Sequence, residues 1–287
     1  MFPPKKALLA MKRILTIQDV SCVGKCSLTV ALPIISAAQI EACVLPTAVL
    51  STHTRFQRYT FADLTDEIEP TMNVWKAEGI TFDGVYTGYL GSFRQMELIE
   101  KLVREFKTED NFFFVDPVLG DGGALYARFD QKFADRMAEL CAYADVISPN
   151  LTEASFMLHK PFQEKGHTEA YVRTTLEELA ALGPKIVLLK GIDYGDGRVG
   201  VATYDSRRNE YSAYFHERIP GAFHGTGDIF ASAVVAAITR ERSIADAVKI
   251  AADFTLDSIR RTVVNPNARN YGVDFESALF DFARKFL

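Results

Sequence analysis

A chain of 287 residues, of which 48% are hydrophobic, is long enough to bury one large α/β core. The 32 basic and 37 acidic side chains give a net charge of −5 at pH 7 without an extended basic run, which argues against nucleic acid as a partner. No apolar run reaches the length of a membrane span, so we expect no membrane segment.

Cysteine usage and the start of the chain indicate a reducing, cytoplasmic setting. The four cysteines form no CxxC pair and no plausible zinc set, and no signal-peptide pattern precedes them. The first strand-like run, "MKRILTIQ", begins at Met11. We therefore expect residues 1–10 to form a flexible extension and residues 11–287 to form a single domain.

Short runs rich in β-branched or aromatic residues alternate with helical patterns along the chain. Strands are predicted at residues 13–18, 42–50, 83–88, 111–117, 145–150 and 185–191. Helices are predicted between them, at residues 27–39, 62–79, 93–107, 131–143 and 168–182. An antiparallel pair at residues 198–205 and 210–218 comes next, followed by three helical stretches. Because most strands are apolar on both faces, we predict an α/β fold with a mostly parallel central sheet, helices on both faces and an antiparallel edge.

Polar, acidic or glycine-rich residues follow nearly every predicted strand. These segments are residues 18–21, 51–55, 87–92, 116–123, 149–153 and 190–197. In open α/β sheets, ligands bind at the carboxyl ends of the strands. Turns favour Gly, Asp and Asn for steric reasons alone, but six such segments along one sheet edge predict a binding site.

The sequence Gly225-Thr226-Gly227-Asp228 precedes a run of small apolar residues that predicts a buried helix. A helix N-terminus exposes unpaired N–H groups with a partial positive charge, so a glycine-lined start can hold an anionic oxygen. Asp228 would lie in the first turn, where a carboxylate can take a proton from an attacking hydroxyl group. In the alternative explanation Asp228 only complements the helix dipole and the glycines shape a turn.

This motif, late in a single α/β chain, resembles the ribokinase-like superfamily, in which it forms the anion hole and its Asp is the catalytic base. Three further segments, "STHTRF" at residues 51–56, "DPVLGDGGALY" at 116–126 and "SPNLTE" at 148–153, are similar to motifs of pyridoxal kinases, and "GYLGS" at 88–92 also matches. The resemblance implies a ribokinase-like three-layer sandwich. It also implies ATP-dependent phosphorylation of the 5′-hydroxyl group of pyridoxal, pyridoxine or pyridoxamine, with Asp228 as general base.

The resemblance also assigns roles to individual residues. The implied substrate pocket contains Asp19, Thr47, His53, Thr54, Arg55, Tyr89 and Asp228. The implied ATP site contains Asp116, Ser148, Asn150, Glu153, Lys190, Arg218, Ile219 and Pro220. Mg²⁺ would arrive with ATP and be organised by Asp116 and Glu153, partly through water. The implied lid comprises Gly120, Asp121, Gly122, Gly123 and Tyr126, with adjacent glycines permitting movement. The resemblance further implies a homodimer and a monovalent cation as a second cofactor.

Several residues leave alternatives open. Asp19 stands where many pyridoxal kinases have Ser and related pyrimidine kinases often have Asp, which keeps a hydroxymethylpyrimidine kinase as an alternative. Those enzymes usually lack the "GDxGxxY" extension that this chain carries. Arg55 is not a general feature of pyridoxal kinases, and His53 could simply be a hydrogen-bonded turn histidine. A catalytically silent vitamin-binding protein on the same scaffold is a third alternative, against which Asp228 and Lys190 argue.

Overall fold

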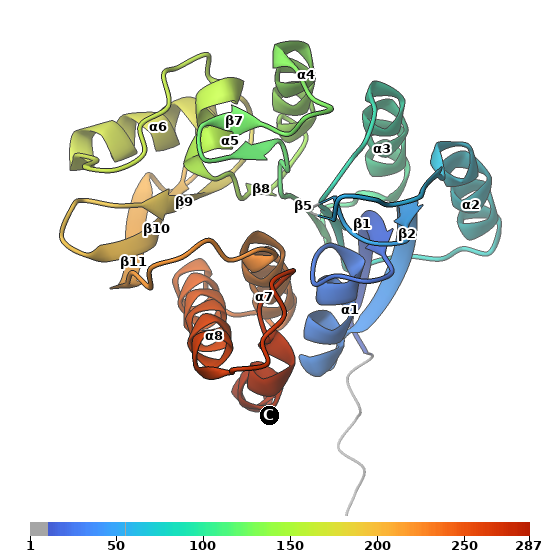
Figure 1. Cartoon of the computed structure of the whole chain (residues 1–287). Coiled ribbons are helices and arrows are strands. Elements are labelled where there is room, and N and C mark those ends of the chain that lie inside the picture. Colours follow the sequence, from blue (N-terminus) through green and yellow to red (C-terminus); the bar gives the residue numbers. More distant parts are fainter. Residues whose placement is uncertain (1–10, 55) are drawn as a thin grey trace, which may run out of the picture.

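A nine-stranded sheet forms the centre of the computed structural model, which describes residues 11–54 and 56–287 (Figure 1). The strand order is β11-β10-β9-β8-β5-β4-β1-β2-β3. Six neighbouring strands pair in parallel: β1 (Arg13–Ser21), β2 (Glu41–Leu50), β4 (Gly84–Thr87), β5 (Phe112–Val115), β8 (Val146–Ile147) and β9 (Ile186–Ile192). The hairpin of β10 (Arg198–Asp205) and β11 (Glu210–Glu217) adds the predicted antiparallel edge.

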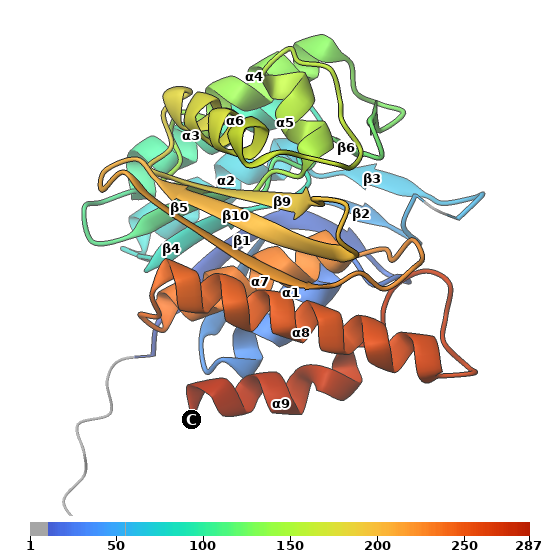
Figure 2. The same cartoon turned by 90° about the vertical axis from the view of Figure 1, so that its left-hand side faces the viewer.

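Helices cover both faces of this sheet, which confirms the predicted three-layer arrangement (Figure 2). One layer holds α2 (Thr65–Ala77), α3 (Phe93–Phe106), α4 (Gln131–Cys141), α5 (Leu151–Met157) and α6 (Glu169–Ala181). The other holds α1 (Leu28–Ala37), α7 (Thr226–Thr239), α8 (Ile244–Val264) and α9 (Leu279–Ala283), the last between the 3₁₀ turns Phe275–Ala278 and Arg284–Phe286. Helix α7 lies between α1 and α8 (Figure 1), and because it is apolar nearly all round, its central residues are fully buried.

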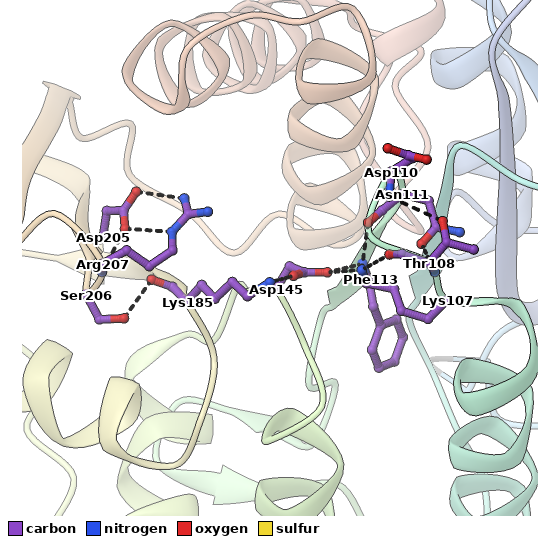
Figure 3. Close-up of polar contacts among 10 residues, drawn as sticks. All are labelled: Lys107, Thr108, Asp110, Asn111, Phe113, Asp145, Lys185, Asp205, Ser206 and Arg207. Carbon is purple, nitrogen blue, oxygen red and sulfur yellow. Dashed lines mark hydrogen bonds and ion pairs between the residues drawn. The ribbon is translucent and has the colours of Figure 1, made fainter.

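A polar network joins the strands at their amino ends (Figure 3). The Asp145 carboxylate accepts the Phe113 N–H at 2.8 Å and the Lys185 ammonium at 2.6 Å. Lys107 lies 3.4 Å from the same carboxylate. Burial opposes ionisation of Asp145, but Lys185, the Phe113 N–H and Lys107 outweigh it and lower the pKa of Asp145. This charged group therefore ties β5, β8 and β9 together at the edge opposite to the predicted site.

The structure differs from the predicted elements in three places. The helix expected from residue 62 begins at Thr65, because Phe61–Asp63 form strand β3 against the end of β2. Asp63 then accepts the Thr65 N–H at 2.8 Å and ends the strand in a turn. Helix α5 and the hairpin of β6 (Gly120–Asp121) and β7 (Ala124–Leu125) are additional elements. The predicted extension, residues 1–10, lies outside the described residues, and no helix in the described part of the chain is long and apolar enough to cross a membrane.

Candidate active site

A cavity of about 360 Å³ opens at the carboxyl edge of the sheet. Its polar wall comes from the ends of β5 and β9, the start of α5, the β6–β7 hairpin and the start of α7. The residues of that wall are Asp116, Asp121, Tyr126, Asn150, Glu153, Lys190 and Gly225 to Asp228. Its apolar wall includes Val199 on β10 and Ile259 on α8. Segments that are far apart in sequence therefore meet in one cavity, at the edge where the sequence predicted a site.

The glycines before α7 give this cavity an open backbone wall. Gly225 is the N-cap of α7 with φ +77°, and a Cβ atom there would lie 2.0 Å from the Lys25 carbonyl oxygen. Both the left-handed backbone and the close contact therefore require glycine. A Cβ atom on Gly227 would instead point into open space. The first turn of α7 thus presents N–H groups to the cavity, an arrangement suited to an anionic oxygen.

Asp228 is a partly buried carboxylate in that same first turn. Its Oδ2 atom accepts the Ser27 N–H at 3.0 Å. Burial is the main cause that raises the pKa of Asp228 to about 7; the Ser27 N–H and Lys190 oppose this rise, and Asp116 and Asp19 add to it. A group with this pKa is poised to exchange a proton near neutral pH.

Lys190 and Asp116 form a buried ion pair on the polar wall of the cavity. The Lys190 Nζ atom is 2.7 Å from Asp116 Oδ1, and the side chains are 14% and 3% exposed. Burial raises the pKa of Asp116 in spite of Lys190. Burial alone would lower the pKa of Lys190, but Asp116 and Glu153 raise it, so the ammonium keeps its charge at the cavity wall.

Asn150 and Glu153 form a capping box at the start of α5. Asn150 donates its N–H to Glu153 Oε2 at 2.7 Å and accepts the Glu153 N–H at 2.9 Å. Glu153 Oε1 accepts the Leu119 N–H at 3.3 Å, and the Asn150 amide donates to the Gly120 carbonyl at 2.9 Å. These two residues therefore hold the base of the hairpin in place.

The donor set for a metal ion is sparse. In the described part of the chain, no three His, Cys, Asp or Glu side chains are grouped so that they could hold a metal. Both Glu153 oxygens already accept backbone N–H groups, so Glu153 fits an indirect role, whereas Asp116 lines the cavity and pairs with Lys190 through Oδ1. This set fits a Mg²⁺ ion that keeps water ligands and binds phosphate oxygens rather than a dedicated protein cage.

The segment expected to be a lid is the β6–β7 hairpin. Its turn residues Gly122 and Gly123 have φ angles of +60° and +83°. The Gly123 N–H donates to the Thr152 hydroxyl at 2.9 Å, which fastens the turn to α5. Asp121 and Tyr126 face the cavity, and Tyr126 remains 46% exposed. The hairpin therefore borders the space above Asp228.

Two of the residues expected to face the substrate ring lie near the carboxyl ends of neighbouring strands, Asp19 in β1 and Thr47 in β2. Asp19 is buried and accepts the Ser27 hydroxyl at 2.5 Å and the Ser21 hydroxyl at 3.0 Å. Burial raises the pKa of Asp19, and the two serines oppose the rise. Thr47 is fully buried and donates its hydroxyl to the Tyr89 carbonyl at 3.2 Å. Asp19 and Thr47 are thus held rigidly by protein partners.

His53 and the residues around it form an aromatic cluster that the sequence did not indicate. The His53 Nε2 atom is 3.0 Å from the Tyr271 carbonyl oxygen, which favours the tautomer that donates from Nε2. The rings of Phe56 and His224 lie 5.2 and 6.4 Å from the His53 ring. His53 therefore joins two distant segments, as a hydrogen-bonded turn histidine does. His224, which immediately precedes the glycine motif, lines the cavity and was missed by the sequence analysis.

Some predicted site residues lie elsewhere. Among described residues, the lining of the cavity leaves out members of both implied pockets: Asp19, Thr47, His53, Thr54 and Tyr89 of the substrate pocket, and Arg218, Ile219 and Pro220 of the ATP site. Arg218 forms an ion pair with Asp193. Ser148 also stays out of the lining, because it is fully buried behind the edge of the sheet. Thr54 is exposed, and Arg55 falls outside the described residues.

Comparison with known proteins identifies proteins that are similar to this chain in sequence and in structure. The model of the phosphomethylpyrimidine kinase family matches residues 32–274. A Bacteroides thetaiotaomicron protein assigned as a phosphomethylpyrimidine kinase, crystallised with pyridoxal, is 35% identical with a TM-score of 0.90, covering 95% of this chain and 96% of that chain. Pyridoxal kinase from Lactobacillus plantarum is 28% identical with a TM-score of 0.87, covering 96% of this chain and 98% of that chain.

A longer relative shares only part of its length with this chain. The chloroplastic thiamine biosynthetic bifunctional enzyme of Arabidopsis thaliana is 32% identical over 178 residues, which are 60% of this chain and 32% of the enzyme. Taken together, the similar proteins confirm the ribokinase-like fold and the resemblance to pyridoxal kinases. They include kinases named for pyridoxal and kinases named for a pyrimidine.

Proposed function

The chain belongs to the phosphomethylpyrimidine kinase family, and from this premise we propose that it transfers the γ-phosphoryl group of ATP to the 5′-hydroxyl group of a B6 vitamer. Pyridoxal, pyridoxine and pyridoxamine all carry this hydroxyl group. The observation that carries the proposal is the position of Asp228, whose carboxylate shares one cavity with the Lys190 ammonium and the open backbone at Gly227.

In the proposed reaction Asp228 takes the hydroxyl proton as the hydroxyl oxygen attacks the γ-phosphorus, and the bond from the γ-phosphorus to the bridging oxygen breaks to release ADP. The pKa of Asp228, raised to about 7, lets the carboxylate accept that proton near neutral pH. The N–H groups of the first turn of α7 would bind the oxygens of the transferring group, and Lys190 would balance their charge. Asp116, which lines the cavity, is the residue that would hold a Mg²⁺ ion, and the ion would help to neutralise phosphate charge.

Two observations support a B6 vitamer as the substrate. The Bacteroides thetaiotaomicron protein, 35% identical over nearly the whole chain, was crystallised with pyridoxal. The hairpin at residues 120–125 also lies in the segment that the resemblance to pyridoxal kinases assigns to a lid. A lid over the reacting groups excludes water and so limits hydrolysis of ATP.

Hydroxymethylpyrimidine is the second candidate substrate, and Asp19 is the observation that favours it. Its carboxylate is buried between two serine hydroxyls, so it offers a fixed acidic group beside the loop after β1. A ring that carries an amino group would complement such an acid better than one that carries a phenolic oxygen. The pyrimidine kinase therefore stays as an alternative within the same reaction class.

The test is ATP-dependent phosphorylation of the three B6 vitamers and hydroxymethylpyrimidine in parallel, with Asp228→Asn as the control. We expect turnover of B6 vitamers and a loss of about 10²- to 10⁴-fold in the variant, with ATP binding retained. Turnover of the pyrimidine alone would replace the B6 proposal with the second candidate. Binding of vitamer without turnover would indicate a silent vitamin-binding protein, and a fully active variant would remove Asp228 from the mechanism.

A further inference from the structure

Lys25 lies in the turn between β1 and α1, and its ammonium group binds two acids that follow it by about 250 residues. The Lys25 Nζ atom is 2.6 Å from Asp274 Oδ1 and 2.9 Å from Glu276 Oε2. Lys25 and Asp274 are only 16% and 17% exposed. Burial by itself would lower the pKa of Lys25, but Asp274 and Glu276 raise it. The ion pair is therefore charged and largely shielded from water.

Asp274 is itself fixed to the end of α8. Its N–H donates to the Thr262 hydroxyl at 2.7 Å, and its Oδ2 atom accepts the Asn265 amide at 2.6 Å. Ion pairs between two mobile surface side chains contribute little, because holding both in place costs entropy. Here one partner is already held, so Lys25 can fasten its own turn to a rigid support.

The same turn is packed closely against the glycine motif. The Lys25 carbonyl oxygen lies 2.0 Å from the place that a Cβ atom of Gly225 would occupy. On its other side, the Lys25 side chain lies 2.4 Å from the corresponding place at Gly272. The turn therefore fits between the start of α7 and the segment after α8, with glycine at both contacts.

Ser27 ends this turn in a strained backbone conformation. Its φ and ψ angles are 50° and −133°, a combination that non-glycine residues rarely adopt. In this conformation Ser27 donates hydrogen bonds to two carboxylates. Its N–H donates to Asp228 at 3.0 Å, and its hydroxyl donates to Asp19 at 2.5 Å. Such strain persists only where the surrounding contacts hold the backbone in place.

We infer that Lys25, clasped by Asp274 and Glu276, is a positioning residue that holds the turn so that the Ser27 N–H stays on the Asp228 carboxylate. The inference rests on the proposed function, in which Asp228 takes the proton from the substrate. Release of the clasp lets Ser27 relax toward an ordinary backbone conformation, which withdraws its N–H from Asp228. The carboxylate then loses both its orientation and a partner that favours the charged form.

The variant Lys25→Gln tests the clasp, and Lys25→Arg is the conservative variant that keeps the charge. We expect Lys25→Gln to lower kcat roughly 10- to 100-fold, as small misplacements of reacting groups do, with the KM for ATP nearly unchanged. The acid limb of the kcat–pH profile should move to higher pH, since Asp116 and Asp19 still face Asp228 and only Lys190 then opposes them. Lys25→Arg should restore most of both properties.

A second readout does not depend on activity. Hydrogen exchange of the peptide that contains Ser27 should be faster in Lys25→Gln than in the wild type and unchanged in the control Lys185→Gln, whose ion pair lies at the opposite edge of the sheet. Asp274→Asn removes the charge of the more buried of the two acids that bind Lys25, and it replaces Lys25→Gln if the latter does not fold.

Unchanged exchange at Ser27, or a loss of activity without a shift of the pH profile, would overturn the positioning role. If the wild type phosphorylates none of the four substrates, the proposed function fails, and the exchange experiment still decides whether the clasp holds Ser27.

Discussion

The Lys190 ammonium lies 2.7 Å from the Asp116 carboxylate, and both groups are largely buried. Lys190→Met would leave a buried carboxylate without its partner, so it should lower the free energy of unfolding by about 3 kcal/mol. Urea unfolding at pH 7 measures this change. The matched control is Lys185→Met, which removes a 51% exposed lysine from Asp145 and should cost about 1 kcal/mol or less. Equal losses in the two variants would show that burial does not set the strength of the Lys190 pair.

The two glycines before Asp228 should respond differently to alanine. Gly225→Ala forces a left-handed backbone and a clash with the Lys25 carbonyl, so it should lower stability by roughly 2 kcal/mol or more. Gly227→Ala meets open space inside a helix, so stability should stay constant or rise by roughly 0.5–1 kcal/mol. The methyl group added in Gly227→Ala would nevertheless fill the space that the proposed reaction assigns to the transferring phosphoryl group. A stable Gly227→Ala variant with undiminished kcat would contradict that assignment of the space.

Activity should depend on pH through Asp228. Burial raises the pKa of this carboxyl group to about 7, and in the proposed reaction it must be deprotonated to accept the proton of the substrate. We therefore expect kcat/KM to fall as the pH drops below about 7, with an apparent pKa near that value. The residual activity of Asp228→Asn should lack this limb. An acid limb that survives in the variant would belong to another group.

The free energy of unfolding should also depend on pH through Asp228, but in the opposite direction to activity: it should fall as the pH rises. The folded state raises the pKa of Asp228 from 3.8 to about 7, so it binds the proton more tightly than the unfolded state does. Stability from this group is then present below about pH 4 and is lost as the pH rises to about 7.

Asp228→Asn removes this loss. Since Asp228 is partly exposed, we expect a gain on the order of 1 kcal/mol at pH 8 and almost none at pH 4, measured by urea unfolding. Equal stabilisation of Asp228→Asn at pH 4 and pH 8, or destabilisation at both, would show that burial of the Asp228 charge does not lower the stability of the protein.

Local sequence patterns are sufficient to predict most of the strands and helices of the fold. The apolar runs that became β1, β5 and β9 carry their own strand preference, and their burial on both faces requires a covered sheet. Strand β3 was missed because Phe61–Asp63 has only a short pairing partner, the end of β2, which no local pattern reveals. The capping box at Asn150 and Glu153 was assigned to ligand binding alone, although the same spacing is a helix start signal.

The candidate site was predictable to the extent that its residues follow strands. Asp116 directly follows β5 and Lys190 lies near the carboxyl end of β9 in the same sheet, so their meeting follows from topology. The contacts of Lys25 with Asp274 and of His53 with Tyr271 depend on how distant loops fold back, which periodicity cannot encode. The ion pair of Arg218 with Asp193 likewise joins two loops and has no signature in the local sequence.

The link between Lys25 and Asp274 also bears on how the protein becomes active during synthesis. Ribosomes add roughly 5–20 residues per second, and the two partners are 249 positions apart. A nascent chain therefore carries its first strand and Lys25 for about 10 to 50 seconds before Asp274 is even added. The first strands can pair during that interval, but the turn that presents Ser27 to Asp228 cannot be locked until Asp274 has been added. Catalytic competence in the proposed reaction would then wait for a residue that is synthesised well after Asp228 itself.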